Sequence, residues 1–354
     1  MVEMPSELRK DYILDRWVIM AVERAKRSTD FYIKRADVQA QKECPFCPGN
    51  EATTPPATLV YLQKDGEILK DRDSNGSRWK GWLVRCFPNL YPALRATVQE
   101  TESPDTFLLK RGAFGFHEIV VESPSHGEHP GIAGLEQLRL VFEAQLDLLK
   151  RYYCDKRVKY VQIFRNHGRE AGASLSHTHT QIMALPLIPS LVMDELKSAE
   201  NYFRDQCQCA FCKIIEEEKE GPRLIFESEY FIVLAPWASI YPFEFWILPK
   251  MHESSLLGIQ DSEKKDFVKT LRISLGALRK LLDDPPYNYG FHIAPKTSEE
   301  YNEGYHWHLE VYPKLATWAG FELSSGMYIN TASPEMAAET LREYVRIETK
   351  EIEV

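Results

Sequence analysis

The sequence predicts an α+β protein built from two similar halves, each with a largely antiparallel sheet flanked by helices. The same landmarks occur twice in the same order: a Cys-x-x-Cys pair, a strand that runs into a histidine, an amphipathic helix, a strand and a His-x-His motif. One helix in each half lies among strands that turns join, which is typical of antiparallel sheets. We expect the halves to span 1–196 and 197–354, with the boundary within 186–208.

The elements follow from local patterns. In the first half, we expect strands over 16–21, 82–92, 116–126 and 159–165, and a helix over 135–149, where apolar residues recur at helical spacing. The segment from Gln63 to Ser77 is polar and is expected to be a mobile loop. In the second half, strands are expected over 230–242, 243–252 and 289–294. A helix between them should begin at an N-cap, Asp261 or Ser262, and end before Pro285.

The composition is that of a slightly acidic globular chain. Of its 354 residues, 44% are hydrophobic, and 52 acidic against 43 basic residues give a formal net charge of −9. Nucleic-acid binding needs a basic surface, so we expect no nucleic-acid partner. No run has the length and apolar character of a signal peptide or a membrane span, so we expect a cytoplasmic protein with no membrane partner.

Each half offers four side chains that suit a tetrahedral metal site. Close cysteine pairs in a large cytosolic chain indicate metal before disulfide, and Zn²⁺ takes cysteine and histidine ligands. The alternatives are empty thiols in one or both pairs, or one all-cysteine site that both pairs share. We expect one zinc ion per chain, with room for two. The candidate ligands are Cys44, Cys47, His126 and His177 in the first half, and Cys209, Cys212, His252 and His306 in the second.

The other cysteines and histidines receive structural interpretations. Cys86 and Cys154 lie in apolar strand and helix contexts, so we expect both to be buried, inert thiols. Four histidines stand alone in the sequence and are not expected to be ligands: His117, His129, His167 and His292.

The segment 172–181 carries the most specific pattern. His177 and His179 would point to the same face of an extended strand. If His177 is held in a closed zinc site, His179 is left free, and a neutral imidazole can attack phosphorus to form a covalent phosphoramidate. Gln181 could then donate to a phosphate oxygen, and Ser174 in the small-residue turn could contact the same phosphate. The alternative for His179 is a hydrogen-bonded core histidine.

The second half does not repeat this context. His308 is the counterpart of His179, but no glutamine follows it two residues later, so we interpret His308 as a core residue or a degenerate relic. Elsewhere, Arg24 and Arg27 are candidate phosphate clamps or part of a solvated basic face. The run from Phe87 to Pro92, with Asn89, could hold a base and ribose, or be a turn with core aromatics.

These motifs resemble the galactose-1-phosphate uridylyltransferase family of the histidine triad superfamily, from Glu7 through Pro334. The resemblance implies two histidine-triad-like halves, a homodimer, and ping-pong transfer of a nucleoside monophosphate through a nucleotidyl-histidine. It implies that His179 is the nucleophile and His177 a zinc ligand. The positions that match nucleotide-contacting residues are Arg24, Arg27, Phe87, Asn89, Asn166, Ala173, Ser174 and Gln181, and those that match the sugar site are Phe321 and Glu322.

The chain also departs from the family pattern. The motif is usually His-Pro-His-Gly-Gln, but Thr178 and Thr180 replace its proline and glycine. Ala173 stands where a cysteine is common, and Ala316 and Thr317 stand where a lysine and a phenylalanine are usual. The motif is similar to His-Ser-His-Ser-Gln of a plant branch whose members act as ADP-glucose phosphorylases.

We therefore expect a nucleotidyltransferase whose partners are a nucleotide sugar and a hexose 1-phosphate. In the first hypothesis, UDP-glucose gives its uridylyl group to His179 and then to galactose 1-phosphate. In the alternative, ADP-glucose gives its adenylyl group to phosphate; a related option is a dinucleotide hydrolase that uses water. A hypothesis of a different class is a zinc-stabilised binding protein without catalysis, against which the acidic balance and Gln181 argue.

Overall fold

A computed structural model describes residues 6–24, 44–74, 76–99, 101, 107–296 and 303–353. The helices in this part of the chain are α1 (Leu135–Tyr153), α2 (Ser190–Gln206), α3 (Ala210–Glu218), α4 (Asp261–Leu282), α5 (Gly320–Ser325) and α6 (Pro334–Glu353). The strands of the first half are β1 (Glu7–Lys10), β2 (Trp17–Met20), β3 (Leu59–Lys64), β4 (Glu67–Asp71), β5 (Trp82–Pro88), β6 (Phe116–Val121), β7 (Tyr160–His167) and β8 (His179–Leu185). Those of the second half are β9 (Leu224–Glu227), β10 (Phe231–Leu234), β11 (Phe245–Pro249), β12 (Tyr287–His292), β13 (His308–Pro313) and β14 (Tyr328–Asn330).

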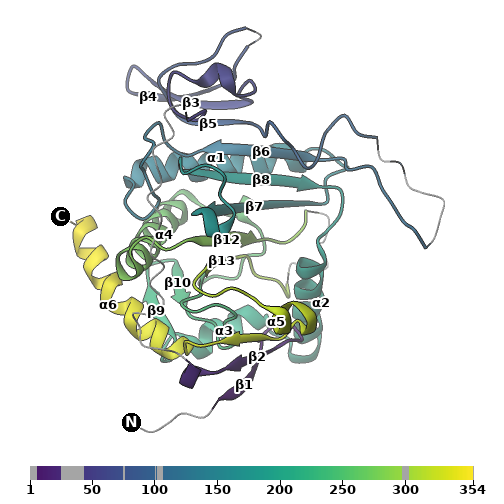
Figure 1. Ribbon diagram of the computed structural model, residues 1–354, viewed down its shortest axis with the longest axis vertical. Helices are drawn as coiled ribbons and strands as arrows, with labels where there is room; N and C mark the ends of the chain where they lie inside the picture. The colour runs from purple at the N-terminus through teal and green to yellow at the C-terminus, as the bar shows by residue number, and fades with distance from the viewer. Residues whose placement is uncertain are drawn as a thin grey trace.

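One 11-stranded sheet runs through both halves in the order β4-β3-β5-β6-β8-β7-β12-β13-β11-β10-β9 (Figure 1). Its pairings are antiparallel, as expected. The two halves meet where β7 pairs with β12, with Asn166 opposite Asn288. On either side of this seam the strand order is mirrored, since β7-β8-β6-β5 corresponds to β12-β13-β11-β10. The mirrored order is what a duplication of one unit predicts.

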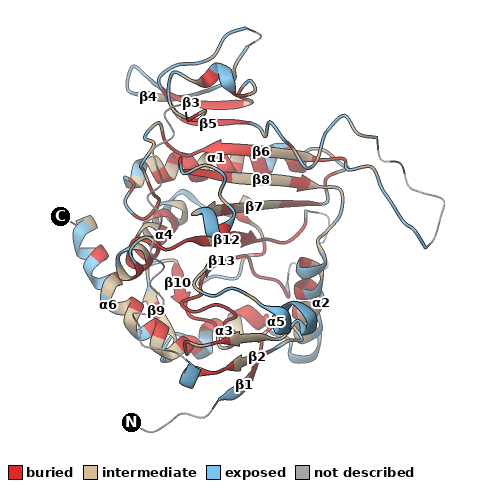
Figure 2. Ribbon diagram, viewed as in Figure 1, coloured by how far each residue is buried: buried red, intermediate tan, exposed pale blue. Residues whose placement is uncertain are grey.

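One face of the sheet is covered by the two long amphipathic helices. Helix α1 lies against β5, β6, β7 and β8, and packs on α4, which in turn contacts α6 (Figure 1). Its buried residues recur at helical spacing and include Leu138, Phe142 and Leu149. Together with the inward side chains of the strands, they form the main hydrophobic core, and many residues of these helices and strands are red, that is buried, in Figure 2. Burial of this apolar stripe is the main stabilising contribution to the fold.

The opposite face of the first half carries a smaller core beside the Cys-x-x-Cys turn. Phe46 packs there with Phe87, Ile119 and Val121. Because side chains alternate along a strand, Val120 of the same strand points into the main core instead. This small core fixes the cysteine turn over the start of β8, which begins with His179.

Three local expectations were wrong. The segment from Gln63 to Ser77 is not simply a loop, because it includes the end of β3, β4 and a tight turn at Asp65 and Gly66, both with positive φ. Cys154 is exposed, because it lies just beyond α1, whereas Cys86 is fully buried as expected. The N-cap of α4 is Gln260, whose backbone N–H donates to Glu263 at 2.7 Å.

A second, 3-stranded sheet pairs β1, β2 and β14. Strand β14 from the second half lies parallel to β2 from the first, with Ile329 opposite Ile19. The division at 196/197 stays a prediction; α2 runs continuously across it from Ser190 to Gln206. In the described residues no helix is both long and apolar enough to cross a membrane.

Candidate active site and metal centres

The first predicted ligand set comes together in space. Cys47 Sγ lies 3.3 Å from His126 Nδ1 and 3.5 Å from His177 Nδ1, and Cys44 Sγ lies 3.7 Å from His177 Nδ1. A metal ion at the centre of a tetrahedron with bonds of 2.0–2.3 Å has its ligand atoms about 3.5 Å apart. The four side chains therefore fit a tetrahedral metal ion.

The outer nitrogens of the two histidines support the same interpretation. His177 Nε2 donates to the Ser123 carbonyl at 2.8 Å, and His126 Nε2 lies 3.1 Å from the Ser176 hydroxyl. With Nε2 protonated, Nδ1 of His177 carries the lone pair that faces the two sulfurs. Such partners fix the tautomer and orientation of a metal-binding imidazole.

His179 opens β8 and is 5% exposed. Its Nδ1 lies 2.8 Å from the His177 carbonyl, which can only accept, so Nδ1 is the protonated nitrogen. The lone pair is then on Nε2. The His179 ring meets the Phe46 ring edge-on, with the two ring centroids 5.4 Å apart. Burial lowers the pKa of His179 below the ordinary value, which keeps the imidazole neutral and nucleophilic.

Gln181 points to the same face of β8 and is oriented by His117, which the sequence reasoning missed. The Ala93 N–H donates to His117 Nδ1 at 3.3 Å, so Nε2 of His117 carries its proton. That Nε2 donates to Gln181 Oε1 at 2.8 Å. Because the Gln181 oxygen is used in this bond, its amide NH₂ group is left to act as a donor. The sequence pattern assigned His117 no role, because only the pairing of β6 with β8 brings it beside Gln181.

The turn before the motif is built with a glycine in the left-handed region. Gly172 has φ 87°, which a larger residue would rarely adopt. Ser174 is exposed and Ala173 is half-buried beside it. Asn166, at the end of β7, accepts from Asn288 Nδ2 at 2.8 Å, so its own amide NH₂ is oriented as a donor. Asn288 belongs to the second half, which is why sequence spacing gave no sign of it.

The remaining residues predicted to contact the nucleotide are less directly linked to His179 and Gln181. Phe87 is 2% exposed and packs between the Phe46 ring and the Arg85 guanidinium. Asn89 follows β5 and lies 3.3 Å from His117 Nε2, next to Gln181. Arg24 is exposed at the end of a short 3-10 helix, and Arg27 lies outside the described residues. The roles of these residues stay predictions.

Comparison with known proteins agrees with this geometry. The family model "Galactose-1-phosphate uridyl transferase, C-terminal domain" matches residues 160–351, and the corresponding N-terminal domain model matches residues 74–189. This chain belongs to the galactose-1-phosphate uridyl transferase family. Members of this family are nucleotidyltransferases. His126, His177 and the motif through Gln181 lie within the matched ranges, whereas Cys44 and Cys47 precede them.

Two curated relatives differ in the reaction that their names describe. The chain is 36% identical to an ADP-glucose phosphorylase of Arabidopsis thaliana, over 95% of this chain and 92% of that protein. It is 31% identical to a galactose-1-phosphate uridylyltransferase of Thermotoga maritima, over 95% of this chain and 98% of that protein. A crystal structure of an Arabidopsis ADP-glucose phosphorylase with bound ADP-glucose superposes with a TM-score of 0.80 at 34% identity, covering 96% of this chain and 99% of that one. A uridylyltransferase structure superposes with a TM-score of 0.73 at 27% identity, covering 96% of this chain and 99% of that one.

The second predicted ligand set also converges in this member of the uridyl transferase family. Cys212 Sγ lies 3.5 Å from His252 Nδ1 and 3.7 Å from His306 Nδ1, and Cys209 completes the group. His306 Nε2 donates to the Pro249 carbonyl at 2.8 Å, as His177 does to Ser123. Both halves therefore offer a complete set of ligand atoms, and a shared all-cysteine site is not needed to satisfy either pair.

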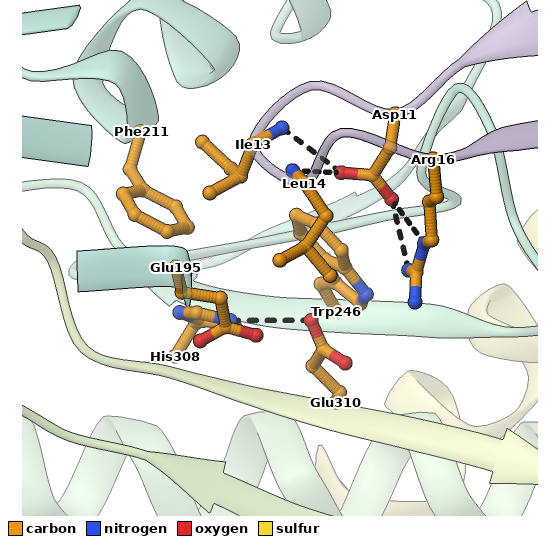
Figure 3. A pocket seen from close by; sticks show the side chains of 9 residues that line it. All are labelled: Asp11, Ile13, Leu14, Arg16, Glu195, Phe211, Trp246, His308 and Glu310. Atoms are coloured by element: carbon orange, nitrogen blue, oxygen red, sulfur yellow. Dashed lines mark hydrogen bonds and ion pairs between the residues drawn. The ribbon is translucent and has the colours of Figure 1, made fainter. Parts of the chain in front are cut away.

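A third group of possible ligands surrounds His308 (Figure 3). His308, His292, Glu195 and Glu310 are all buried and lie close enough to share an ion. Figure 3 draws three of them, Glu195, His308 and Glu310. His308 Nε2 lies 3.2 Å from Glu310, and His292 Nδ1 lies 2.9 Å from Glu195. Burial lowers the pKa of His292, but the two carboxylates outweigh it and raise that pKa to about 9. His292 was not expected to be a ligand, but strand pairing with His308 places it in this group of possible ligands.

His129 and His167 also have neighbours, with Asp284 between them. His167 Nε2 lies 2.9 Å from Asp284, so neither histidine stands alone. The Gly131 N–H donates to His129 Nδ1 at 2.9 Å, which places the proton of the neutral ring on Nε2, facing Tyr287. His129, His167 and Asp284 lie close enough to share an ion, although neither histidine was expected to be a ligand.

The predicted sugar-binding residues lie on another part of the molecule. Phe321 is 45% exposed on α5, and Glu322 caps that helix by accepting from the Ala319 N–H at 2.9 Å. Helix α5 contacts β14 of the small sheet, whereas His179 lies on β8 of the large one. In Figure 1, α5 lies at the lower right near β14 and β2, well away from β8. Within one chain, the structure does not bring Glu322 together with His179.

Proposed function

We propose that the chain transfers a nucleoside monophosphate through a covalent bond to His179 Nε2. The observation that carries the proposal is the hydrogen bond from His179 Nδ1 to the His177 carbonyl, which leaves Nε2 as a neutral nucleophile on the face that Gln181 shares. His179 Nε2 would attack the phosphorus next to the nucleoside, and the sugar 1-phosphate would leave with the bridging oxygen. The acceptor phosphate would then take the nucleotidyl group and regenerate His179.

The surrounding side chains would assist this displacement. The bond from Nδ1–H to a carbonyl supports the positive charge that the ring acquires on attack. The Gln181 amide, and that of Asn166, would donate to phosphate oxygens whose charge increases in the transition state. Ser174 and the backbone around Ala173 would add donors from the turn.

We assign zinc to both Cys₂His₂ groups, since thiolate and imidazole ligands in tetrahedral arrangement suit Zn²⁺. Four protein ligands leave no open coordination position. Zinc would therefore hold Cys44, Cys47 and His126 around His177, and so fix the chain on which His179 lies, without contacting the substrate.

For the substrate, we favour phosphorolysis of ADP-glucose over uridylyl transfer from UDP-glucose to galactose 1-phosphate. Support comes from the higher identity to the ADP-glucose phosphorylase, 36% against 31%. The hydroxyl residues Thr178 and Thr180 and the missing lysine and phenylalanine before Glu322 point the same way. In this reaction ADP-glucose and phosphate give ADP and glucose 1-phosphate, with the adenylyl group carried on His179.

Mass measurement of the intact protein separates the two substrates. The enzyme is mixed with ADP-glucose or with UDP-glucose alone, without an acceptor, and weighed. An adenylyl adduct supports phosphorolysis of ADP-glucose, and a uridylyl adduct supports the transferase reaction. If neither nucleotide sugar gives an adduct, the covalent mechanism is refuted.

A homodimer is also part of the proposal. Because Glu322 and His179 are far apart within one chain, a sugar-binding role for Glu322 requires a second copy that presents its α5 to this site. Sedimentation of the pure protein tests this. A monomer that turns over nucleotide sugars would exclude Glu322 from the site.

A further inference from the structure

We infer that four buried side chains beneath the candidate nucleophile, Glu122, Arg165, Thr178 and Thr180, form a clamp that positions His179 for attack. The inference rests on the proposed function of His179. It gives the two threonines of the His-Thr-His-Thr-Gln motif a role, where the family pattern has proline and glycine. These are positioning residues, because none of them lies on the face that a substrate would contact.

The Glu122 carboxylate is the centre of the clamp. It accepts from the Thr178 hydroxyl at 2.6 Å, from the Thr180 hydroxyl, and from the Arg165 guanidinium at 2.5 Å. The side chains of Arg165 and Glu122 are 2% and 4% exposed, and both threonines are buried. Gln145 of α1 donates to the Thr180 hydroxyl at 3.1 Å from the other side.

Alternation along the strand separates this clamp from the chemistry. His177, His179 and Gln181 face the site, so Thr178 and Thr180 point to the opposite face, toward α1. Arg165 lies on the neighbouring strand β7, and Glu122 follows β6 on the other side of β8. The clamp therefore ties together the three strands that carry His117, Gln181 and Asn166.

The clamp reaches His179 through the main chain. The Glu122 N–H donates to the Thr178 carbonyl at 3.2 Å, and Arg165 donates to the His179 carbonyl at 3.3 Å. The peptide units on both sides of His179 are thus held by the two residues of the ion pair, by Glu122 through its backbone N–H and by Arg165 through its guanidinium. Since His179 Nδ1 bonds the adjacent His177 carbonyl, the direction of Nε2 depends on the position of this backbone.

A gain in folding stability does not readily explain a buried ion pair of this kind. Taking two charges out of water costs several kcal/mol per ion, and apolar replacements of a buried pair are often neutral or stabilising. Here every oxygen of Glu122 has a hydrogen-bond donor, which fixes one geometry. A single geometry is what a nucleophile needs, because a misplacement of about 1 Å costs about 100-fold in rate.

The test replaces the threonine hydroxyls while keeping their shape. T178V/T180V removes both hydroxyl donors to Glu122 and leaves Arg165, and T178S/T180S keeps the hydroxyls. Thr270 of α4 provides a matched control, since it is equally buried and its hydroxyl donates to Ser228 at 3.0 Å, away from the site. The measurement is the single-turnover rate of adduct formation with ADP-glucose and with UDP-glucose, as a function of sugar concentration, together with metal content and the thermal midpoint.

We expect T178V/T180V to form the adduct about 10- to 100-fold more slowly at saturation, with a half-saturating concentration within about threefold of the wild type. T178S/T180S should restore the rate, and T270V should leave it unchanged even where it lowers the thermal midpoint. Metal content should be unchanged in all variants. If the double valine variant does not fold, T178V and T180V singly give the same comparison with one hydroxyl removed at a time.

Two outcomes would overturn the inference. One is a valine variant that melts earlier but forms the adduct as fast as the wild type, which would make the clamp purely structural. The other is a serine variant as slow as the valine variant, which would mean that the hydroxyls are not the cause. If the wild type itself forms no adduct with either sugar, the proposed function is refuted and the inference falls with it, which is a distinguishable result.

Discussion

Replacing His177 and His179 one at a time should separate a metal ligand from a nucleophile. The two rings are two residues apart, and each is held by its own backbone carbonyl, that of Ser123 for His177 and that of His177 for His179. The sulfurs of Cys44 and Cys47 lie within 3.7 Å of His177 Nδ1. We expect His179→Ala to abolish turnover and leave the metal bound, and His177→Ala to lose both.

The magnitudes follow from these contacts. Loss of a covalent nucleophile costs about 10⁴-fold or more in turnover. Structural zinc is bound with about 10–16 kcal/mol, so one of four donors is worth about 3 kcal/mol, or about 100-fold in metal affinity. The His179→Ala protein should also be less stable by about 1 kcal/mol, for the lost hydrogen bond to the His177 carbonyl, plus a cavity contribution.

The assay is metal per chain after dialysis against a competing chelator, measured beside turnover and adduct mass. His308→Ala is the informative control, because it removes the equivalent ring of the second half and should leave the adduct detectable. Turnover by His179→Ala within about tenfold of the wild type would refute the nucleophilic role. Full retention of the first metal in His177→Ala would refute its role as a ligand.

Three further predictions test other parts of the structure. Metal analysis of the wild type should give two ions per chain. The double variant Cys209→Ser/Cys212→Ser should hold one ion and still form the adduct. One ion in the wild type would mean that the second site is empty. Burial would raise the pKa of Glu51, but hydrogen bonds from Lys80, the Gly49 N–H and an indole hold it at about 2. This contributes about 3 kcal/mol of stability that is present above the unfolded-state pKa of about 4.5 and is lost as pH falls toward 2. The thermal midpoints of wild type and Glu51→Gln should therefore differ at pH 7 and converge below pH 4.5, and a constant difference would contradict the assignment. Trp307 is 1% exposed and packs against three phenylalanine rings, so Trp307→Ala should cost about 3–5 kcal/mol. A thermal midpoint equal to that of the wild type would contradict this packing.

Features that depend on local spacing were predicted correctly. The hydrophobic periodicity of 135–149 and the stop at Pro285 correspond to α1 and α4. The repeated cysteine and histidine landmarks predicted two groups of four ligand atoms, and the structure brings both groups together. These signals are available because each motif lies within a few residues, and the order of the motifs is the same in both halves.

Features that depend on strand register were missed. His117 orients Gln181, and Asn288 orients Asn166, across pairings of strands that are 64 and 122 residues apart in the chain. Glu122 gave no local signal, since one acidic residue after an apolar strand is common at surfaces. Its burial is decided by Arg165 of β7, which no spacing rule connects to it. The loop expected over Gln63–Ser77 failed for a related reason, because a polar hairpin at a sheet edge has the composition of a loop.

The comparison between the two halves explains why one chain should carry one nucleophile. His308 has the same backbone hydrogen bond as His179, from Nδ1 to the carbonyl two residues before it, at 3.1 Å. Its Nε2, however, faces the Glu310 carboxylate, and the rings of Trp246 and Phe211 cover it. The cavity that remains there is about 10 Å³, which is room for about one water molecule and not for a phosphate. A carboxylate at this position would also repel a phosphate, whereas the amide of Gln181 can donate to one. Under the proposed mechanism, the residue two positions after the second histidine would therefore decide which half can bind a phosphate, although the His-x-His geometry is the same in both.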